Sequence, residues 1–239
     1  MYKVHVLAYS LNALLNPVSH IKSLQTTSLS TLVAALKYGG VAHYSADLLY
    51  PPDGNATEEM NNPDLDIDKI QPMSKRNMEI FKAFKYNMKR GVFPPVRVVY
   101  DQNYGFNVEA LAPIAKYTLV GEYVGDVVTA DHSGKSNSDS LFLLLQTEDP
   151  QTSLIIDPTH SGNYSRFFSG INNRNLLSKR KANVRSRRFA MDNKVHVALF
   201  TSRDIEAGEI LSYDYNAGNH GKCVEEWAKA GFYDTSNFF

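Results

Sequence analysis

Gly162-Asn-Tyr-Ser-Arg-Phe-Phe-Ser-Gly-Ile-Asn-Asn173 is the most informative stretch of this chain. A second stretch lies far from it in the sequence and reads Phe200-Thr-Ser-Arg-Asp-Ile-Glu-Ala-Gly-Glu-Ile-Leu-Ser-Tyr-Asp-Tyr215. The second stretch ends in two tyrosines that flank an aspartate. Alone, such a triplet is typical of a core more often than of a catalytic site, because tyrosine is frequently buried for packing. Its interpretation therefore depends on the rest of the chain.

The composition describes a globular chain without a strong overall charge. It has 239 residues, 43% of them hydrophobic, which suits one generous domain or one domain with a small helical extension. The formal net charge is zero, so attraction to nucleic acid would have to come from a local basic surface. The single cysteine, Cys223, excludes a disulfide framework and favours a reducing compartment. The histidines lack metal-ligand spacing, and we expect no metal, no signal peptide and no membrane span.

Two helices are expected in the N-terminal part of the chain. Residues 28–38 carry an apolar stripe that ends at Gly39-Gly40. Residues 74–90 carry apolar side chains at helical spacing, with Ser74 as the N-cap and Gly91 at the end. The second pattern is the longer and more regular, so it predicts the main helix of the protein.

Charged residues in the same region indicate solvent-exposed surface. Residues 51–72 hold six acidic residues against one lysine and predict a solvated loop. The face of the 74–90 helix opposite the apolar stripe is basic. We interpret that face as solvated, in preference to contacting DNA or a histone. Its basic residues are Lys75, Arg76, Lys82, Lys85, Lys89 and Arg90.

From Val96 onward the chain changes to short apolar and β-branched segments separated by turns. There is no glycine-rich phosphate loop and no alternation of strand with helix, which argues against a doubly wound nucleotide-binding fold. We predict an α+β protein in which a mostly-β domain at 92–218 follows a helical extension with an acidic loop at 1–91 and precedes a tail at 219–239. The strand-like segments are 96–100, 119–128, 141–145, 154–156 and 195–200.

Four pieces of the chain, in this order, resemble the motifs of SET-domain protein lysine methyltransferases. Residues 104–110 are similar to the family's G-x-G turn, and residues 121–126 (Gly-Glu-Tyr-Val-Gly-Asp) to its E-Y-x-G-E motif. The two stretches quoted first resemble the signatures R-F-I-N-H-S-C and R-D-I-x-x-G-E-E-L-x-Y-D-Y. Gly-Ile-Asn-Asn at 170–173 is similar to the plant-type Trithorax-related branch, which monomethylates lysine twenty-seven of histone H3. The resemblance implies a β-clip of small sheets with a knot-like crossing.

The resemblance implies a binding site for S-adenosylmethionine. The G-x-G turn would lie at the cofactor's methionine and carboxylate end, and the first signature at its adenine and amine. Asn107 stands where the family has a second glycine, Ser169 where it has asparagine, and Gly170 where most members have histidine. Asn107 and Ser169 leave open a catalytically silent module that binds chromatin. The implied cofactor-binding residues are Gly105, Phe106, Asn107, Arg166, Phe167, Ser169, Gly170 and Tyr215.

The resemblance also implies a narrow channel for a substrate lysine. Tyr123, Tyr213 and Tyr215 would wall it as the catalytic residues, lower the pKa of the lysine ammonium by desolvation and align its amine for attack. Tyr215 would lie nearest the reacting centre. The hydroxyl of Tyr213 would occupy the room that a second methyl group needs, which favours monomethylation. The implied substrate contacts are Asp139, Ser140, Asn172 and Tyr213.

As a whole, the resemblance implies a nuclear enzyme that monomethylates lysine twenty-seven of histone H3 on the tail or the nucleosome. Another histone lysine or a non-histone protein stays open as the substrate, because peptide choice depends on surface contacts. Residues 174–194 hold eight basic residues and one acidic residue, which suits non-specific DNA contact and a solvated insertion equally. The tail at 219–239 is expected to fold back and close the site.

Overall fold

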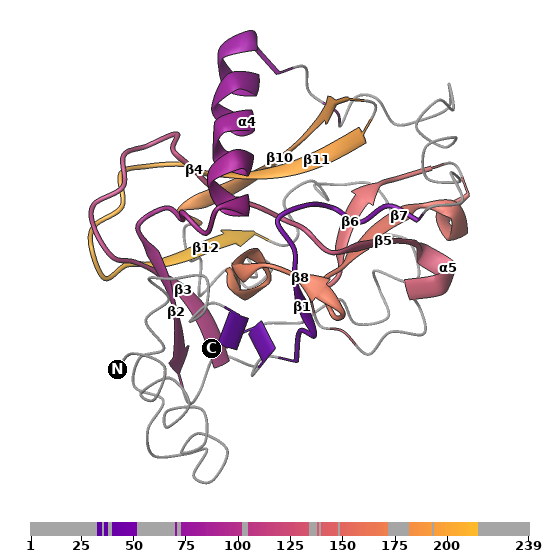
Figure 1. Cartoon of the computed structure of the whole chain (residues 1–239), viewed down its shortest axis with the longest axis horizontal. Coiled ribbons are helices and arrows are strands. Elements are labelled where there is room, and N and C mark those ends of the chain that lie inside the picture. The colour runs from indigo at the N-terminus through magenta and orange to yellow at the C-terminus, as the bar shows by residue number, and fades with distance from the viewer. Residues whose placement is uncertain are drawn as a thin grey trace, which may run out of the picture.

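The computed structural model consists mainly of short strands in small sheets, with one long helix packed on them (Figure 1). The prediction of a mostly-β fold is therefore confirmed. No helix in the described part of the chain is long and apolar enough to cross a membrane. The structure describes residues 33–34, 36–37, 40–51, 70, 73–101, 105–133, 138, 140–147, 149–171, 182–192 and 194–214.

A four-stranded sheet in the order β2-β3-β12-β9 joins distant parts of the sequence. Strands β2 (Val96–Asp101) and β3 (Gly105–Ala110) are antiparallel neighbours, and β3 pairs with β12 (Ile210–Asp214). On its other side, β12 runs parallel to β9 (Ser169–Ile171). This pairing brings the first signature stretch alongside the end of the second.

A three-stranded antiparallel sheet in the order β10-β11-β4 forms the platform for the long helix. Its strands are β10 (Val184–Met191), β11 (Lys194–Thr201) and β4 (Leu119–Glu122). The interpretation of 174–194 as a solvated insertion is wrong for β10. This strand pairs with β11 along its whole length, and its Phe189 is buried. Apolar side chains between the arginines make it a half-buried strand.

A third sheet, in the order β5-β7-β6, is also antiparallel. It contains β5 (Asp126–Thr129), β6 (Phe142–Leu145) and β7 (Leu154–Asp157). The short helices α5 (Ala130–Ser133) and η2 (Pro150–Thr152) lie between these strands in the sequence. The structure thus divides the single strand predicted at 119–128, because β4 and β5 belong to different sheets.

Helix α4 (Lys75–Lys89) forms where the apolar spacing predicts it. Ser74 is the N-cap, and its hydroxyl accepts a hydrogen bond from the backbone N–H of Asn77 at 3.2 Å. Phe81 is fully buried and packs edge-on against Phe189 with 4.8 Å between ring centroids. Figure 1 shows α4 crossing β10 and β11, and the apolar side of the helix packs on one face of this sheet.

The basic face of α4 is not solvated throughout, and the prediction was wrong for Lys85. Lys75, Arg76, Lys82 and Arg90 are exposed, whereas the Lys85 side chain is only 12% exposed and forms a salt bridge with buried Glu122. At this point the helix faces the N-terminal segment and not solvent. Helical periodicity reports apolar side chains and does not reveal a cation that is buried with a partner.

The N-terminal segment that precedes α4 is built into the same core as the sheets. Strand β1 (His43–Tyr44) pairs in parallel with β8 (Ser161–Gly162), which leads into the 3-10 helix η3 (Tyr164–Phe167). Leu48, close after β1, belongs to the main buried cluster. The described residues 33–34 and 36–37 of the helix predicted at 28–38 are helical. The loop predicted at 51–72 and the tail at 219–239 lie almost wholly outside the described residues, and the domain boundaries stay predictions.

Gly125 allows the chain to pass from the sheet of β4 to the sheet of β5. A Cβ atom at this position would lie 2.6 Å from the backbone oxygen of Asp157, which is far inside van der Waals contact. Gly121, four residues earlier, is different, because a Cβ there would meet only side chains at 3.5 Å or more. The glycine at 125 is thus required by the close approach of β7, and the glycine at 121 is not.

We therefore expect Gly125→Ala to lower the free energy of unfolding by about 1–3 kcal/mol, as overpacking of a core does. Gly121→Ala is the matched control and should cause a much smaller loss, or a slight gain from reduced freedom of the unfolded chain. Urea denaturation followed by circular dichroism measures both values. Equal destabilisation by the two variants would contradict this account of Gly125.

Candidate active site

Three aromatic rings from three different parts of the chain meet in one cluster. Tyr123 follows β4, Phe142 begins β6 and Tyr213 lies on β12. Ring centroids are 4.9 Å apart between Tyr123 and Phe142 and 6.2 Å apart between Phe142 and Tyr213. Tyr123 and Tyr213 are almost fully buried, whereas Phe142 is partly exposed. The cluster gives a narrow apolar surface that carries two phenolic hydroxyl groups.

Ser140 joins this aromatic cluster to η3. The hydroxyl of Tyr123 donates a hydrogen bond to the backbone oxygen of Ser140. The guanidinium of Arg166 donates to the Ser140 hydroxyl at 3.5 Å and to the backbone oxygen of Pro158 at 3.4 Å. Three residues that the sequence assigned separately to the catalytic, substrate and cofactor groups are thus in direct contact.

Asn107 and Ser169, the two residues that left a catalytically silent module open, contact each other. The hydroxyl of Ser169 on β9 donates to Oδ1 of Asn107 on β3, and Nδ2 of Asn107 donates to the backbone oxygen of Gly105 at 2.9 Å. Asn107 is only 8% exposed, so its amide is held in one orientation. In the sequence, Asn107 and Ser169 are two separate departures that put cofactor binding in doubt. In the structure, they form one hydrogen-bonded pair.

A second group of aromatic side chains lies beside this pair. Phe106 on β3 packs against Phe167 of η3 with 4.9 Å between ring centroids, and Tyr100 on β2 packs edge-on against Phe106 at 5.1 Å. The guanidinium of Arg166 lies 5.5 Å from the centre of the Phe167 ring. Flat apolar rings next to a fixed cation suit a planar, partly polar ligand group.

Buried hydrogen bonds hold η3 in place. Asn163 caps it, with Oδ1 accepting from the backbone N–H of Ser165 at 2.8 Å and Nδ2 donating to the backbone oxygen of Glu122 at 3.2 Å. The hydroxyl of Tyr164 donates to the backbone oxygen of Val120 at 2.6 Å. Complete burial raises the pKa of Tyr164 well above its usual value, so this tyrosine stays a neutral donor.

Several predicted site residues can be placed, and others cannot. Gly170 pairs with Tyr213 in the β9–β12 register, so these two predicted residues are neighbours. Tyr215, Asp139 and Asn172 lie outside the described residues, and their assigned roles stay predictions. Within the described ranges, no three His, Cys, Asp or Glu side chains gather as a metal site would require.

The sequence interpretation missed Phe142 and its neighbour Arg188. The sequence places Phe142 in the apolar run 141–145 and predicts a strand there, yet its ring contacts both Tyr123 and Tyr213. The guanidinium carbon of Arg188 on β10 lies over that ring, 5.3 Å from its centre, and the guanidinium donates to the backbone oxygen of Leu143 at 3.0 and 2.6 Å. The nearness of Phe142 to Ser140 in the sequence was the one signal that could have identified it.

Comparison with known proteins identifies similar chains. Residues 105–216 match the SET domain family model. The chain is 38% identical to histone-lysine N-methyltransferase ATXR5 of Arabidopsis thaliana over 192 residues, which are 80% of this chain and 50% of that protein. It is 35% identical to histone-lysine N-methyltransferase ATXR6 of the same organism over 193 residues, 80% of this chain and 55% of that protein. This chain thus spans about half the length of these curated relatives.

A solved structure extends the similarity to three dimensions. The crystal structure of ATXR5 in complex with histone H3.1 mono-methylated on arginine twenty-six matches this fold with a TM-score of 0.73 and 35% sequence identity. The match covers 85% of this chain and 94% of the ATXR5 chain in that structure. It is therefore much wider than the segment matched by the family model, and it includes residues outside 105–216.

The contact between Asn107 and Ser169 predicts coupled stability effects. Asn107→Ala and Ser169→Ala should each lower the free energy of unfolding by about 1 kcal/mol, because each removes one partner of a half-buried hydrogen bond. The double variant should lose less than the sum, with a coupling energy of about 0.5–1 kcal/mol, since both single variants lose the same hydrogen bond. The measurement is urea denaturation of the four proteins in the cycle.

Ser202→Ala serves as the control for this cycle. The Ser202 hydroxyl donates to the backbone oxygen of Ala182 at 3.3 Å and not to Asn107. Combined with Asn107→Ala it should be additive within about 0.5 kcal/mol. Additivity in the Asn107 and Ser169 cycle would mean that their hydrogen bond does not contribute to stability.

Proposed function

Because the chain belongs to the SET-domain family, we propose that it is a histone-lysine N-methyltransferase that uses S-adenosylmethionine as methyl donor. The observation that carries this proposal is the parallel pairing of β9 with β12. It makes Ser169 a neighbour of Ser212 and Gly170 a neighbour of Tyr213, so residues of both signatures lie side by side. The names of the curated relatives, both histone-lysine N-methyltransferases, support the same activity.

The residues around β3 and η3 are compatible with the cofactor. Gly105 has a positive φ of 71°, and a Cβ atom built there would have no neighbour within 4 Å, so open space lies beside this backbone. We assign the methionine end of S-adenosylmethionine to this space and its adenine to the surface of Phe106 and Phe167. Ser169, held by Asn107, would supply a polar contact between the two ends. When bound, the cofactor would supply an electrophilic methyl group on its sulfonium.

The aromatic cluster would prepare the lysine that accepts this methyl group. The amine must be neutral to attack, and a lysine ammonium enclosed by Tyr123, Phe142 and Tyr213 would lose hydration and have its pKa lowered. The same walls would align the amine with the transferred methyl group, and such positioning supplies a large share of rate enhancement. The tyrosine hydroxyls would stabilise the charge as it shifts, while solvent takes the proton. Tyr215 would act at the reacting centre by the family resemblance.

We propose lysine twenty-seven of histone H3 as the substrate and monomethylation as the outcome. The resemblance of residues 170–173 to the plant-type branch supports this lysine. The solved ATXR5 complex with histone H3.1 supports a histone H3 tail as the ligand of this fold. Tyr213, which lies in the tight cluster with Phe142, supports a limit of one methyl group. A histone substrate also implies that the protein works in the nucleus.

Contact with nucleosomal DNA is a further part of this proposal. Arg185 and Arg187 on β10 and Lys194 on β11 are exposed. These side chains come from the basic segment 174–194, and phosphates would be their natural partners. Within that segment, residues 174–181 and 193 lie outside the described residues.

A catalytically silent SET module is the second candidate. The residues that suggested it, Asn107 and Ser169, form a half-buried hydrogen-bonded pair that would hold Ser169 in the cofactor site. This favours the enzyme over the silent module, since a module without cofactor would not need that geometry. Calorimetric titration with S-adenosylmethionine distinguishes the two, because a silent module need not bind it.

The test of the activity is a radiolabelled methyl-transfer assay on recombinant nucleosomes and free histone H3, with mass spectrometry of the labelled peptide. We expect a single methyl group on lysine twenty-seven. Label on another lysine would keep the enzyme and change its substrate. Absence of both transfer and cofactor binding would establish the silent module.

Product degree tests the role given to Tyr213. Tyr213→Phe removes the hydroxyl that limits the space around the lysine amine, and we expect dimethylated product to appear beside monomethylated product in mass spectra. Tyr86→Phe is the control, because Tyr86 lies on α4 and is 60% exposed. A purely monomethylated product from Tyr213→Phe would remove this residue from the control of product degree.

A further inference from the structure

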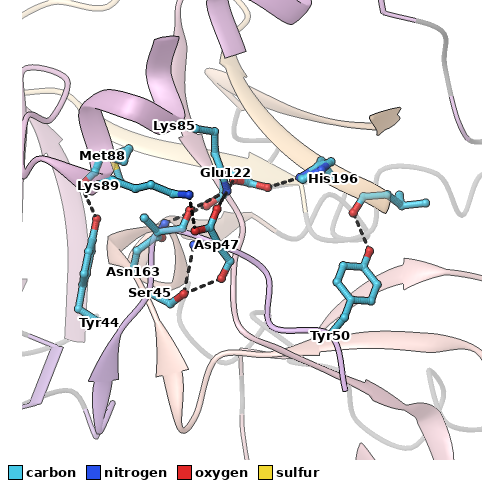
Figure 2. A network of polar contacts seen from close by, with 12 residues as sticks. Tyr44, Ser45, Asp47, Tyr50, Lys85, Met88, Lys89, Glu122, Asn163 and His196 are labelled. Atoms are coloured by element: carbon cyan, nitrogen blue, oxygen red, sulfur yellow. Dashed lines mark hydrogen bonds and ion pairs between the residues drawn. The ribbon is translucent and has the colours of Figure 1, made fainter. Parts of the chain in front are cut away.

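Glu122, the last residue of β4, is a buried carboxylate at the centre of a polar network (Figure 2). Its side chain is only 1% exposed. Oε1 accepts a hydrogen bond from Nδ1 of His196 on β11 at 2.6 Å, and Oε2 accepts one from Nζ of Lys85 on α4. A buried carboxylate is costly unless it is paired and hydrogen-bonded, and here both oxygens are engaged.

The network reaches into the N-terminal segment through Lys85. Nζ of Lys85 also donates to the backbone oxygen of Ala46 at 2.7 Å and pairs with Asp47 at 2.8 Å, and Lys89 pairs with the other oxygen of Asp47 at 2.9 Å. Burial acts to raise the pKa of Asp47, but hydrogen bonds from Lys85 and Lys89 outweigh it and lower the pKa. The negative charges of two carboxylates are therefore compensated by the positive charges of two ammonium groups where the N-terminal segment, α4 and β4 meet.

The partners of Glu122 are themselves held by packing. The ring of His196 packs against Phe81 at 5.3 Å and against Phe189 at 5.5 Å, measured between ring centroids. Nζ of Lys85 lies 5.9 Å from the centre of the Phe81 ring. Both donors thus approach Glu122 from fixed directions, and the carboxylate has little freedom to rotate.

The backbone next to this carboxylate leads directly into the proposed lysine channel. Tyr123 follows Glu122, its N–H donates to the backbone oxygen of Val197 at 2.9 Å, and its hydroxyl donates to Ser140. The backbone oxygen of Glu122 accepts from Asn163, the residue that caps η3. Any shift of the end of β4 would therefore move one wall of the channel and the start of η3 together.

We propose that Glu122 is a positioning residue, held by Lys85 and His196 so that Tyr123 and η3 keep the spacing that lysine methylation requires. This inference rests on the proposed methyltransferase function for its kinetic consequence. Its structural consequence does not: residues 40–51 and α4 are part of the active-site scaffold, although both precede the segment 105–216 that matches the family model. Lys85 is the residue that connects them to the site.

Two lysines on α4 allow a matched test in the full chain. Lys85→Met and Lys89→Met each remove one salt bridge to Asp47, but only Lys85→Met also removes the contact with Glu122. Hydrogen–deuterium exchange reports how firmly the amides of Tyr123 and Ser165 are held. Steady-state kinetics on an H3 peptide gives kcat and KM for the same proteins.

We expect Lys85→Met to speed exchange at Tyr123 and Ser165 and to lower kcat by about 10- to 100-fold, the scale of a small misplacement of catalytic groups. The peptide KM should change by less than about threefold, because contacts outside the channel are retained. Lys89→Met should leave both exchange and kcat near the wild-type values. Equal effects of the two variants, or unchanged exchange at Tyr123 in Lys85→Met, would overturn the proposal.

A double variant separates positioning from simple stability, and serves if Lys85→Met does not fold. Lys85→Met with Glu122→Gln removes the buried charge that Lys85→Met leaves without its lysine partner, while the side chain at 122 keeps its size, so it should recover the melting temperature. Exchange at Tyr123 should stay fast and kcat low. Recovery of wild-type exchange and kcat in this variant would show that the network contributes stability alone. If the wild-type chain transfers no methyl group, the proposed function fails, and the exchange data still decide the positioning role.

Discussion

The parallel pairing of β9 with β12 is the contact on which the rest of the site depends. Each strand is short, and the two are hydrogen-bonded neighbours in which Ser169 pairs with Ser212, Gly170 with Tyr213 and Ile171 with Asp214. The pairing requires the chain to bring Ser169 and Gly170 back beside Ser212 and Tyr213, across the long segment that contains β10 and β11. Strand β3 pairs with the other edge of β12, and Asn107 on β3 is hydrogen-bonded to Ser169 on β9. Both proposed halves of the site, for the cofactor and for the lysine, therefore follow from one strand pair.

The second constraint is the burial of Glu122. A carboxylate that is almost fully enclosed needs donors on both oxygens, and it obtains them from α4 and from β11. These hydrogen bonds connect α4 to β4 and β11 of the sheet β10-β11-β4, and Lys85 also connects α4 to Ala46. Similar polar anchors occur nearby, since the hydroxyl of Tyr44 donates to Met88 on α4 and that of Tyr50 donates to Val195 on β11 (Figure 2). The N-terminal segment is thus held by polar contacts as well as by Leu48 in the core.

Several elements could be predicted because their signal is local. Helix α4 has regular apolar spacing and a serine N-cap, and its observed bounds differ from the prediction by a single residue at each end. Strands β2, β6, β7 and β11 are compact apolar runs, and each lies where it was expected. The failures have equally physical causes. The chain passes from one sheet to another at Gly125, where the backbone of Asp157 lies too close for a Cβ atom. The local sequence of 119–128 does not show this long-range contact. Strand β10 was not predicted, because it has several arginines and few buried apolar residues.

By itself, the sequence determined the fold class, the long helix and the identity of the motif residues, because these depend on the order and chemistry of neighbouring side chains. Only the tertiary structure decided which of those residues touch. The contact between Asn107 and Ser169 joins residues 62 positions apart, and the contact between His196 and Glu122 joins residues 74 positions apart. Tertiary contacts also place Phe142 in the aromatic cluster and Lys85 in a buried salt bridge. A side chain's role is set by the partners that close packing brings to it, and those partners come from parts of the chain that no local pattern connects.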